Sequence, residues 1–383
     1  MTYCRRCLIP DTKPNAVFDA DGVCSACRAA AAKDDALAGV DWDERRRAFD
    51  AIVEAARERR APFYDVLVPV SGGKDSITQV ARLLGRGLRI LAVNVDHAIK
   101  TDIGRWNLGR VAAMGATLIT FRPQEPLHTR LIRLGLEDYG DPDLMSHCLL
   151  HACPLHVALR FQVPLVVLGE NSAAEYGGAA EVAAETQMTR AWFESFAAHS
   201  GATPRTIAER YAIPYEELVL YDFPDELPAS DTTATFMSHY YRWDSEHHRE
   251  IAREHGFREL DHPGEGTYRT YVGLDERMNR VHQYLKLLKF GYGRATDHAC
   301  EDIRAGRLTR EEAKALVREH ERQPLSDDAV AELLPWLGYT RAEFDAILER
   351  YRNRDIWTRD GDGEWIVPGF LEDHIPTPTK GAA

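Results

Sequence analysis

The sequence contains no run of about 20 apolar residues, the length that a membrane-spanning helix requires. Its first residues, Met1 to Cys7, also lack the apolar segment of a secretory signal peptide. We therefore expect a cytoplasmic protein without a membrane partner. The remaining composition is that of an ordinary globular protein, with 44% hydrophobic and 28% charged residues, and 383 residues are enough for two or three domains.

The sequence has fewer positively charged residues than negatively charged ones. The chain has 47 Lys and Arg residues against 60 Asp and Glu residues, which gives a formal net charge of -13 at pH 7. Nucleic-acid binding depends on clustered Lys and Arg that neutralise phosphates. We therefore do not expect a nucleic-acid partner, although local basic sites for small anions remain compatible with this charge.

Cysteine is rare, with seven residues, but four of them form two C-x2-C pairs near the N-terminus: Cys4, Cys7, Cys24 and Cys27. This spacing is typical of a zinc ribbon in which four thiolates bind one Zn²⁺ ion. The alternative, two disulfides, is disfavoured in a reducing cytoplasm. Four thiolates leave no open position, so the zinc should be structural. The intervening segment 9–22 reads as two short strands around an Asp-Gly turn.

Beyond the ribbon, apolar strands alternate with amphipathic helices. The predicted strands are 65–70, 89–96, 116–121 and 164–171, and the predicted helices are 41–59, 75–85, 103–115 and 149–161. Such alternation indicates an α/β fold with a parallel, doubly wound sheet and right-handed crossovers. Ligands of these sheets bind at the carboxyl ends of the strands.

The segment SGGKDS, at 71–76, follows the first predicted strand and begins the next helix. Unpaired N–H groups and the helix dipole at such a position favour an anion. Its members are Ser71, Gly72, Gly73, Lys74, Asp75 and Ser76. The glycines allow close approach of the backbone, Lys74 adds charge, and the serines add hydroxyl groups. A tight turn alone would explain one glycine and one hydroxyl, so we predict a phosphate-binding loop. It lacks the spacing of a Walker loop.

SGGKDS resembles the pyrophosphate loop (PP-loop) of the ATP pyrophosphatases, which include GMP synthetase, NAD synthetase, asparagine synthetase and tRNA-thiolating enzymes. The resemblance implies a Rossmann-like sheet, ATP as co-substrate, Mg²⁺ bridging the phosphates, and adenylation of a substrate oxygen. Asp96 ends the second predicted strand, where this fold usually meets the nucleoside, so we include it among the ATP-binding residues.

Three longer segments, 4–28, 168–178 and 284–313, are similar to the N-acetyl sugar amidotransferases of bacterial surface-polysaccharide pathways. The similarity covers most of the chain from Cys4 to about Val317. It implies that ammonia nitrogen replaces the acetamido oxygen of an N-acetyl sugar, which we expect to be nucleotide-linked. The products would be an acetamidino sugar, AMP and pyrophosphate.

This resemblance also assigns roles to residues outside the loop. Lys289 and Arg294 flank the glycines of KFGYGRATD and would hold phosphates from the opposite wall, as catalytic residues together with Lys74 and Asp75. A basic helix end with a glycine cap is the plainer interpretation of that segment. The substrate-binding candidates, from the end of strand 164–171 and the similar segment that follows, are Glu170, Asn171, Glu175 and Tyr176.

Other cysteines and histidines carry weaker signals. Cys148, Cys153 and Cys300 could bind an iron–sulfur cluster, as in some sulfur-transferring relatives of this fold, but their apolar neighbours favour buried structural thiols. We expect three histidines of helix 149–161 and its start to serve as hydrogen-bonding groups rather than metal ligands: His147, His151 and His156. We assign four more to a solvated or substrate-facing helix: His239, His247, His248 and His255.

The predicted domains are a zinc ribbon (1–32), a helical connector (33–60), a PP-loop domain with substrate-binding insertions (61–294) and a C-terminal helical region (295–383). The chain shows no glutaminase segment, so ammonia must come from solution or from a separate subunit. The resemblance implies partners similar to the histidine-pathway glutaminase and its ammonia channel. These could dock on the ribbon or on the C-terminal helices, which could also form a homodimer.

Two other functions remain open. The same adenylation chemistry could transfer sulfur to a tRNA base or a small metabolite, which would require one or more of Cys148, Cys153 and Cys300. A nucleotide-binding subunit without turnover is the third hypothesis, and the complete set of donors in SGGKDS argues against it.

Overall fold

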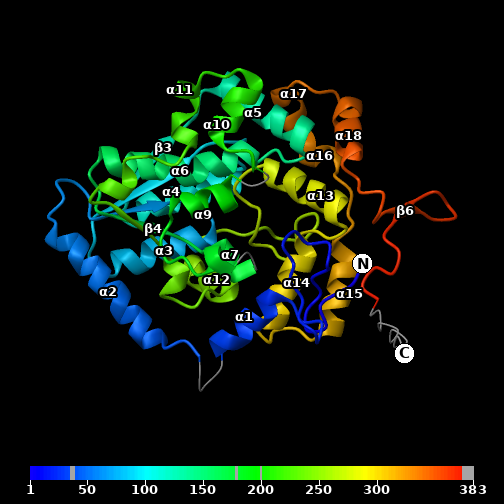
Figure 1. The fold of residues 1–383 in the computed structure, drawn as a ribbon, viewed down its shortest axis with the longest axis horizontal. Helices are drawn as coiled ribbons and strands as arrows, with labels where there is room; N and C mark the ends of the chain where they lie inside the picture. Colours follow the sequence, from blue (N-terminus) through cyan, green and yellow to red (C-terminus); the bar gives the residue numbers. More distant parts are fainter. Residues whose placement is uncertain (35–38, 177–179, 199–200, 373–383) are drawn as a thin grey trace, which may run out of the picture.

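The structure is a computed structural model that describes residues 1–34, 39–176, 180–198 and 201–372. Five parallel strands form one sheet in the order β3-β2-β1-β4-β5 (Figure 1). The strands are β1 (Val66–Pro69), β2 (Ile90–Val95), β3 (Thr117–Phe121), β4 (Leu165–Leu168) and β5 (Thr233–Phe236). In the register of the central strand, Leu67 lies between Leu91 of β2 and Val166 of β4. The predicted α/β class with a parallel, doubly wound sheet is confirmed.

Both faces of the sheet are buried beneath helices. Leu67 points into a core shared with α5 (Glu125–Leu134) and α6 (Leu144–Arg160). Val66 and Val68 point into a second core shared with α2 (Trp42–Glu58), α3 (Lys74–Leu84), α4 (Asp102–Ala113) and α12 (Ser245–Glu254). Successive side chains of a strand point to opposite faces, so a strand covered on both sides must be apolar throughout. This explains the continuous apolar runs in the sequence.

The helices of this α/β part follow the predicted alternation. They are α2 (Trp42–Glu58), α3 (Lys74–Leu84), α4 (Asp102–Ala113), α5 (Glu125–Leu134), η1 (Gly135–Tyr139), α6 (Leu144–Arg160), α7 (Ser172–Tyr176), α8 (Ala180–Ala183), α9 (Arg190–Trp192), η2 (Phe193–Ala197), α10 (Pro204–Tyr211), α11 (Tyr215–Leu218), η4 (Val219–Tyr221), η5 (Leu227–Ala229), η6 (Met237–His239) and α12 (Ser245–Glu254). Helix α6 begins at Leu144, before the predicted residue 149, and β5 was not predicted.

The N-terminal segment packs against the C-terminal helices rather than standing apart. In Figure 1 it lies beside α14 and α15, close to α1 (Ser25–Asp34). Single β-bridges, Tyr3 with Pro10 and Phe18 with Cys24, replace the two predicted strands, and Gly22 forms the turn with a φ of +73°. The ribbon and these helices share one core that contains all four predicted zinc ligands.

Helices also dominate the C-terminal part of the chain, and the first of them begins before the predicted boundary at residue 295. This part comprises α13 (Met278–Phe290), α14 (Arg294–Arg304), α15 (Arg310–His320), α16 (Asp327–Val330), α17 (Leu333–Leu337), α18 (Arg341–Arg350) and a small hairpin of β6 (Thr358–Arg359) and β7 (Trp365–Ile366). Leu136 and Ile132 of the α/β part pack in one core with Met278 and Phe344. This core joins α13 and α18 to α5 and η1 of the α/β part (Figure 1).

Candidate functional site

The SGGKDS loop joins the carboxyl end of β1 to the amino end of α3. Gly72 has a φ of +96°, a conformation that L side chains rarely adopt. A Cβ at this position would lie 2.7 Å from the backbone nitrogen of Leu108 in α4. Glycine is therefore required here both by the backbone conformation and by the close approach of α4.

The loop presents the open end of α3. Gly73 precedes the helix, and among the described residues no side chain caps it. Ser71 Oγ accepts a hydrogen bond from Gly73 N at 3.1 Å, and Ser76 Oγ donates to Gly73 O at 2.9 Å. The serines thus shape the loop, and the first N–H groups of α3 are left in the position that favours an anion.

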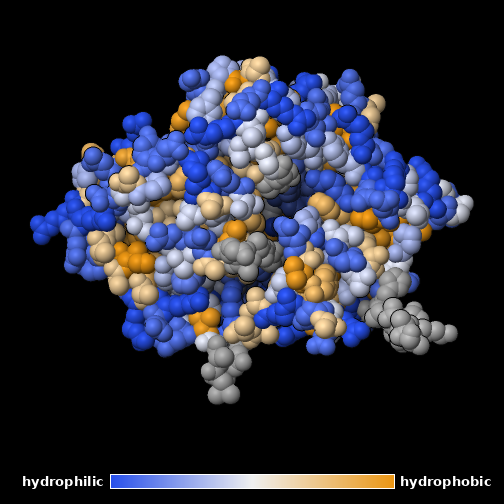
Figure 2. All heavy atoms as spheres, viewed as in Figure 1, coloured by the Kyte–Doolittle hydropathy of each residue, from blue (hydrophilic) through white to orange (hydrophobic). Residues whose placement is uncertain are grey.

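A cavity of about 420 Å³ lies at the carboxyl ends of the central strands. Its polar lining includes Ser71, Asp75, Ser76 and Glu170, four of the predicted site residues. The strand order reverses between β1 and β4, which is where doubly wound sheets bind ligands. The surface is hollowed near the centre of Figure 2. The structure therefore brings the loop and the end of β4 together in one cavity.

Asp75 is held by two partners. Its carboxylate accepts from Lys74 Nζ at 2.7 Å, and its other oxygen lies 2.7 Å from His248 Nδ1 on α12. Burial alone would raise the pKa of Asp75, but the Lys74 charge and the His248 hydrogen bond hold it well below its usual range. His248 is fully buried. The sequence assigned His248 only to a solvated or substrate-facing helix, so its contact with the loop was missed.

Glu170 follows β4 and faces the loop across the cavity. Burial, reinforced by the negative charge of Asp75, raises the pKa of Glu170 to about 7. Burial and the neighbouring negative charge disfavour ionisation of Glu170, so a hard cation beside the two carboxylates would be favourable, because oxygen ligands are those that Mg²⁺ prefers. Asp75 and Glu170 therefore fit the predicted Mg²⁺ ion.

The raised pKa of Glu170 predicts a pH-dependent stability. The folded state keeps the Glu170 proton up to about pH 7, whereas the unfolded state loses it near the ordinary value of 4.5. Stability should therefore fall as the pH rises through this window, by ~1–3 kcal/mol. We expect Glu170→Gln to remove this fall. In metal-free urea denaturation, the free energy of unfolding of the variant should therefore rise relative to that of the wild type between pH 5 and pH 8. Glu194→Gln, an exposed control, should track the wild type; parallel curves for Glu170→Gln would contradict the assignment.

The positive charges of Lys74 and Arg294 both act on a buried histidine, His298. Burial lowers the pKa of His298 well below its ordinary value, and the charges of Arg269, Arg294, Lys74 and Lys286 add to this effect. His298 Nδ1 lies 2.9 Å from Thr267 Oγ1. Both charges thus act on the same buried ring, and the role of Arg294 in holding phosphates stays a prediction. Lys74 itself pairs with Asp75 and is not part of the cavity lining described above.

A carboxylate of the protein itself, that of Glu321, binds the N–H groups at the amino end of α14. Both oxygens of the Glu321 carboxylate are used, accepting from the N–H groups of Gly293 and Thr296 and from the Thr296 hydroxyl. Glu321 is 1% exposed. Glycines of KFGYGRATD thus admit an internal carboxylate, and Arg294, rather than this helix end, remains available for phosphates.

Glu321→Ala should lower the free energy of unfolding by about 3 kcal/mol, because two buried N–H groups would lose their acceptor. Urea denaturation would measure the loss. Glu319→Ala is the matched control, since that neighbouring side chain is 71% exposed. Equal denaturation midpoints for the two variants would show that Glu321 does not hold the start of α14.

Two predicted residues, Lys289 and Asn171, are not among the described residues that line the main cavity. Burial lowers the pKa of Lys289, and the Asp141 charge opposes this effect. Asn171 is 3% exposed, and its Oδ1 accepts from Trp192 Nε1 at 3.1 Å. Its amide group donates to two backbone carbonyls, so Asn171 ties the segment after β4 together. Tyr176 ends α7, and its side chain lies outside the described part of the chain.

Asp96 lies in a neighbouring cavity of about 370 Å³, beyond the carboxyl ends of β2 and β3. Arg122 donates to its carboxylate at 2.6 Å, and Lys100 lies 3.9 Å away. Leu108 lines this cavity and also packs on the glycine loop. The predicted nucleoside position therefore adjoins the loop but belongs to a separate pocket.

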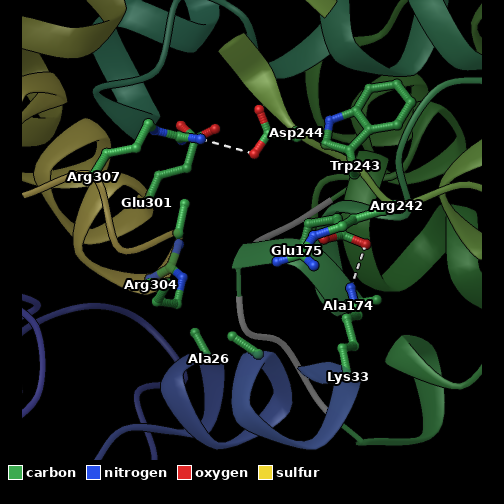
Figure 3. Close-up of a pocket in the computed structure, with 12 residues that line it drawn as sticks. Ala26, Lys33, Ala174, Glu175, Arg242, Trp243, Asp244, Glu301, Arg304 and Arg307 are labelled. Carbon is green, nitrogen blue, oxygen red and sulfur yellow. Dashed lines mark hydrogen bonds and ion pairs between the residues drawn. The ribbon is translucent and has the colours of Figure 1, made fainter. Parts of the chain in front are cut away.

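Glu175 lines a third, smaller cavity of about 80 Å³, between α1, α7 and the end of α14 (Figure 3). Lys33 Nζ pairs with Glu175 at 2.7 Å, and Arg307 pairs with Asp244 at 2.7 Å. These ion pairs balance much of the charge around the cavity. The structure thus separates Glu175 from Glu170, although both were predicted to contact the substrate.

The four N-terminal cysteines form a metal-binding arrangement. Their Sγ atoms all lie within 4.8 Å of one another, and all four side chains are buried. Backbone N–H groups of Cys7 and Cys24 donate to the Cys4 sulfur at 3.5 and 3.3 Å. Burial alone would lower the pKa of Arg304, but the neighbouring cysteines, Cys300 first, raise it. The donor set fits a structural Zn²⁺ ion with a nearby compensating cation.

The three remaining cysteines lie in two different cores: Cys148 and Cys153 in one, and Cys300 in the other. Cys148 and Cys153 are buried residues of α6, and burial raises the pKa of both thiols. Cys300 lies in the ribbon core and contacts Cys7. The interpretation of the two α6 cysteines as buried structural thiols is therefore supported, and a cluster bound by these three is excluded by their positions.

Fold and site together define an α/β protein with a doubly wound parallel sheet, a polar cavity at its switch point and an N-terminal cysteine cluster that could bind zinc. Residues 265–368 match the family model described as "LPS biosynthesis protein WbpG-like, C-terminal domain". This match relates the chain to lipopolysaccharide and polysaccharide biosynthesis. No curated protein matches the chain. Within the described residues, no helix is both long enough and apolar enough to cross a membrane.

Proposed function

We propose that the protein is an ATP-dependent amidotransferase of the PP-loop class, which converts the acetamido group of an N-acetyl sugar into an acetamidino group. One observation carries the proposal: the SGGKDS loop and the carboxylate of Glu170 line one cavity at the switch point of the sheet. The WbpG-like match to residues 265–368 supports a precursor of a polysaccharide as the substrate.

An amide is a poor electrophile, so its oxygen must become a leaving group before ammonia can displace it. Attack of this oxygen on the α-phosphorus of ATP would give an imidoyl adenylate and release pyrophosphate. The N–H groups at the start of α3, with Lys74 beside them and Arg294 nearby, would stabilise the charge that develops on the pyrophosphate. Ammonia would then attack the imidoyl carbon, and AMP would leave.

Asp75 and Glu170 would hold the Mg²⁺ ion, which when bound neutralises charge on the phosphates of ATP. His248 would act as a positioning residue, because its ring fixes the Asp75 carboxylate from α12. The cysteine cluster has no open ligand position. We assign Zn²⁺ a structural role, joining the N-terminal segment to α14 and α15.

Ammonia would come from solution or from a separate glutaminase subunit. The ribbon core includes residues of α14 and α15, so part of the ribbon surface is already covered within the chain. The helices beyond Ala295 remain the other candidate surface for this partner and for a homodimer.

Mass spectrometry would test the proposal. Purified protein is incubated with Mg-ATP, ammonium and a panel of UDP-linked and free N-acetyl sugars. Replacement of oxygen by NH should make one sugar lighter by about one mass unit, with AMP and pyrophosphate formed in equal amounts and nothing formed when ATP is omitted. No change in any sugar, combined with AMP formation when sulfide is supplied, would overturn amidination in favour of sulfur transfer.

A further inference from the structure

One wall of the main cavity is a face of α6. His147, Leu150, His151 and Pro154 all line it, at the i, i+3, i+4 and i+7 positions of a helix. They lie in the same cavity as Glu170 and the SGGKDS loop. The two histidines therefore belong to the site, although neither has a role in the function proposed above.

The tautomer of His151 follows from its hydrogen bond. Nδ1 lies 2.8 Å from the backbone oxygen of His147, and a carbonyl oxygen can only accept. Nδ1 must therefore carry a proton. Burial lowers the pKa of His151, so the ring is neutral at pH 7 and Nε2 holds a lone pair. The side chain is partly exposed and lines the cavity, so Nε2 is the ring atom that can accept a proton there.

The ring of His151 is also held in place. Its centroid lies 5.3 Å from that of Trp192, and Trp192 Nε1 donates to Asn171 Oδ1. Asn171 thus acts on this histidine through the tryptophan. A group whose tautomer and orientation are both fixed is pre-organised to accept a proton from one direction.

Pro154 changes the backbone of the same wall. Proline has no N–H, so the carbonyl of Leu150 receives no helix hydrogen bond from position 154. Both residues line the cavity. An acceptor carbonyl beside an imidazole lone pair suits a small N–H donor such as ammonia or ammonium.

We propose that His151 is the general base of the amination step, taking a proton from the ammonia nitrogen that attacks the activated sugar. This inference rests on the proposed function and deepens it. The ammonia lone pair forms the new C–N bond, and Nε2 of His151 takes one proton from that nitrogen. The C–O bond to AMP then breaks and its electron pair leaves with AMP. The resulting amidinium retains the sugar nitrogen, and His151 returns its proton to solvent.

Comparing the two half-reactions of His151→Gln tests this role. Sugar-dependent exchange of labelled pyrophosphate into ATP reports adenylation alone, and amidine formation at varied ammonium reports both steps. We expect exchange to remain within a few-fold of the wild type and amidination at pH 7 to fall about 100-fold or more. Added imidazole should restore part of the rate. His156→Gln is the matched control: it lies on α6 too, but its Nε2 bonds to Asp222 O.

The pH profile separates a base from a merely structural residue. At a fixed concentration of free ammonia, amidination by the wild type should fall at acidic pH as His151 becomes protonated, and this fall should be absent from the residual activity of His151→Gln. The other titratable groups around the cavity are Asp75 of α3, Glu170 after β4 and His147 of α6, and all three are unchanged in the variant.

Several results would overturn the inference. Wild-type amidination by His151→Gln would exclude a base role, and an equal loss of exchange and amidination would make His151 part of the adenylation site instead. A wild-type protein that exchanges pyrophosphate with no acetamido sugar would overturn the proposed function itself, and the base role with it.

Discussion

Replacing Lys74 with alanine should slow AMP formation at least about 100-fold while the protein remains folded. Lys74 is 8% exposed, and its ammonium group lies 2.7 Å from Asp75. The substitution removes the charge beside the start of α3 but leaves the loop backbone, which is fixed by the conformation of Gly72. Asp75 would retain only His248 as a partner, so the variant loses phosphate stabilisation and carboxylate orientation together. Steady-state AMP release under saturating Mg-ATP and sugar would measure the effect, which should fall mainly on kcat.

The control for this prediction is Lys314→Ala. Lys314 has a similarly buried side chain and a carboxylate partner, Glu311, at 2.8 Å, but it lies on α15. We expect this variant to keep wild-type turnover. Near-normal AMP formation by Lys74→Ala would place the phosphates elsewhere, whereas equal losses in both variants would mean that the effect reflects the removal of any buried lysine.

The sheet was predictable because its strands bury both faces. Runs such as 66–70 and 90–93 are continuously apolar, and the helices between the strands are amphipathic, so four of the five strands are evident from periodicity. Strand β5 was missed. Its sequence, Thr233–Phe236, is only four residues long with two threonines, and its pairing with β4 depends on a connection that periodicity does not reveal.

Local sequence also located the glycine loop, since a strand end, two glycines and a helix start are neighbours in the chain. The partners of that loop could not be predicted in the same way. His248 and Asp75 are 173 positions apart, and the contact exists only because α12 packs against α3 on the second face of the sheet. Glu321 is likewise brought to Gly293 by the pairing of α14 with α15.

Proximity in sequence was a poor guide after β4. Glu170, Asn171 and Glu175 are close along the chain and were predicted to share one role. A strand end followed by a helical turn points successive side chains in different directions, so Glu170 lines the main cavity, Asn171 turns into the protein and Glu175 lines the cavity beside α1.

Cys24→Ser should release the zinc and lower the thermal unfolding midpoint by on the order of 10 °C. Four thiolates at one ion would hold the N-terminal segment together, and the core that this segment shares with the C-terminal helices includes Ala295 and Val317. Losing the ion should therefore loosen α14 and α15 as well as the ribbon. Metal analysis of the wild type should give about one zinc per chain. Thermal unfolding of the wild type in the presence of a chelator should show the same lowered midpoint as Cys24→Ser.

Cys300→Ala is the decisive comparison, because Cys300 contacts Cys7 but lies on α14 outside the four-sulfur group. A closed tetrahedral site needs no fifth ligand, so this variant should retain its zinc and lose only the small stability of a buried thiol. Cys153→Ala, which changes a buried residue of α6, should likewise retain its zinc and lose little stability. If Cys300→Ala lost the metal as completely as Cys24→Ser, Cys300 would be a fifth sulfur at the site. A structural zinc role for the ribbon would then be wrong, and a redox or sulfur-carrying role would replace it.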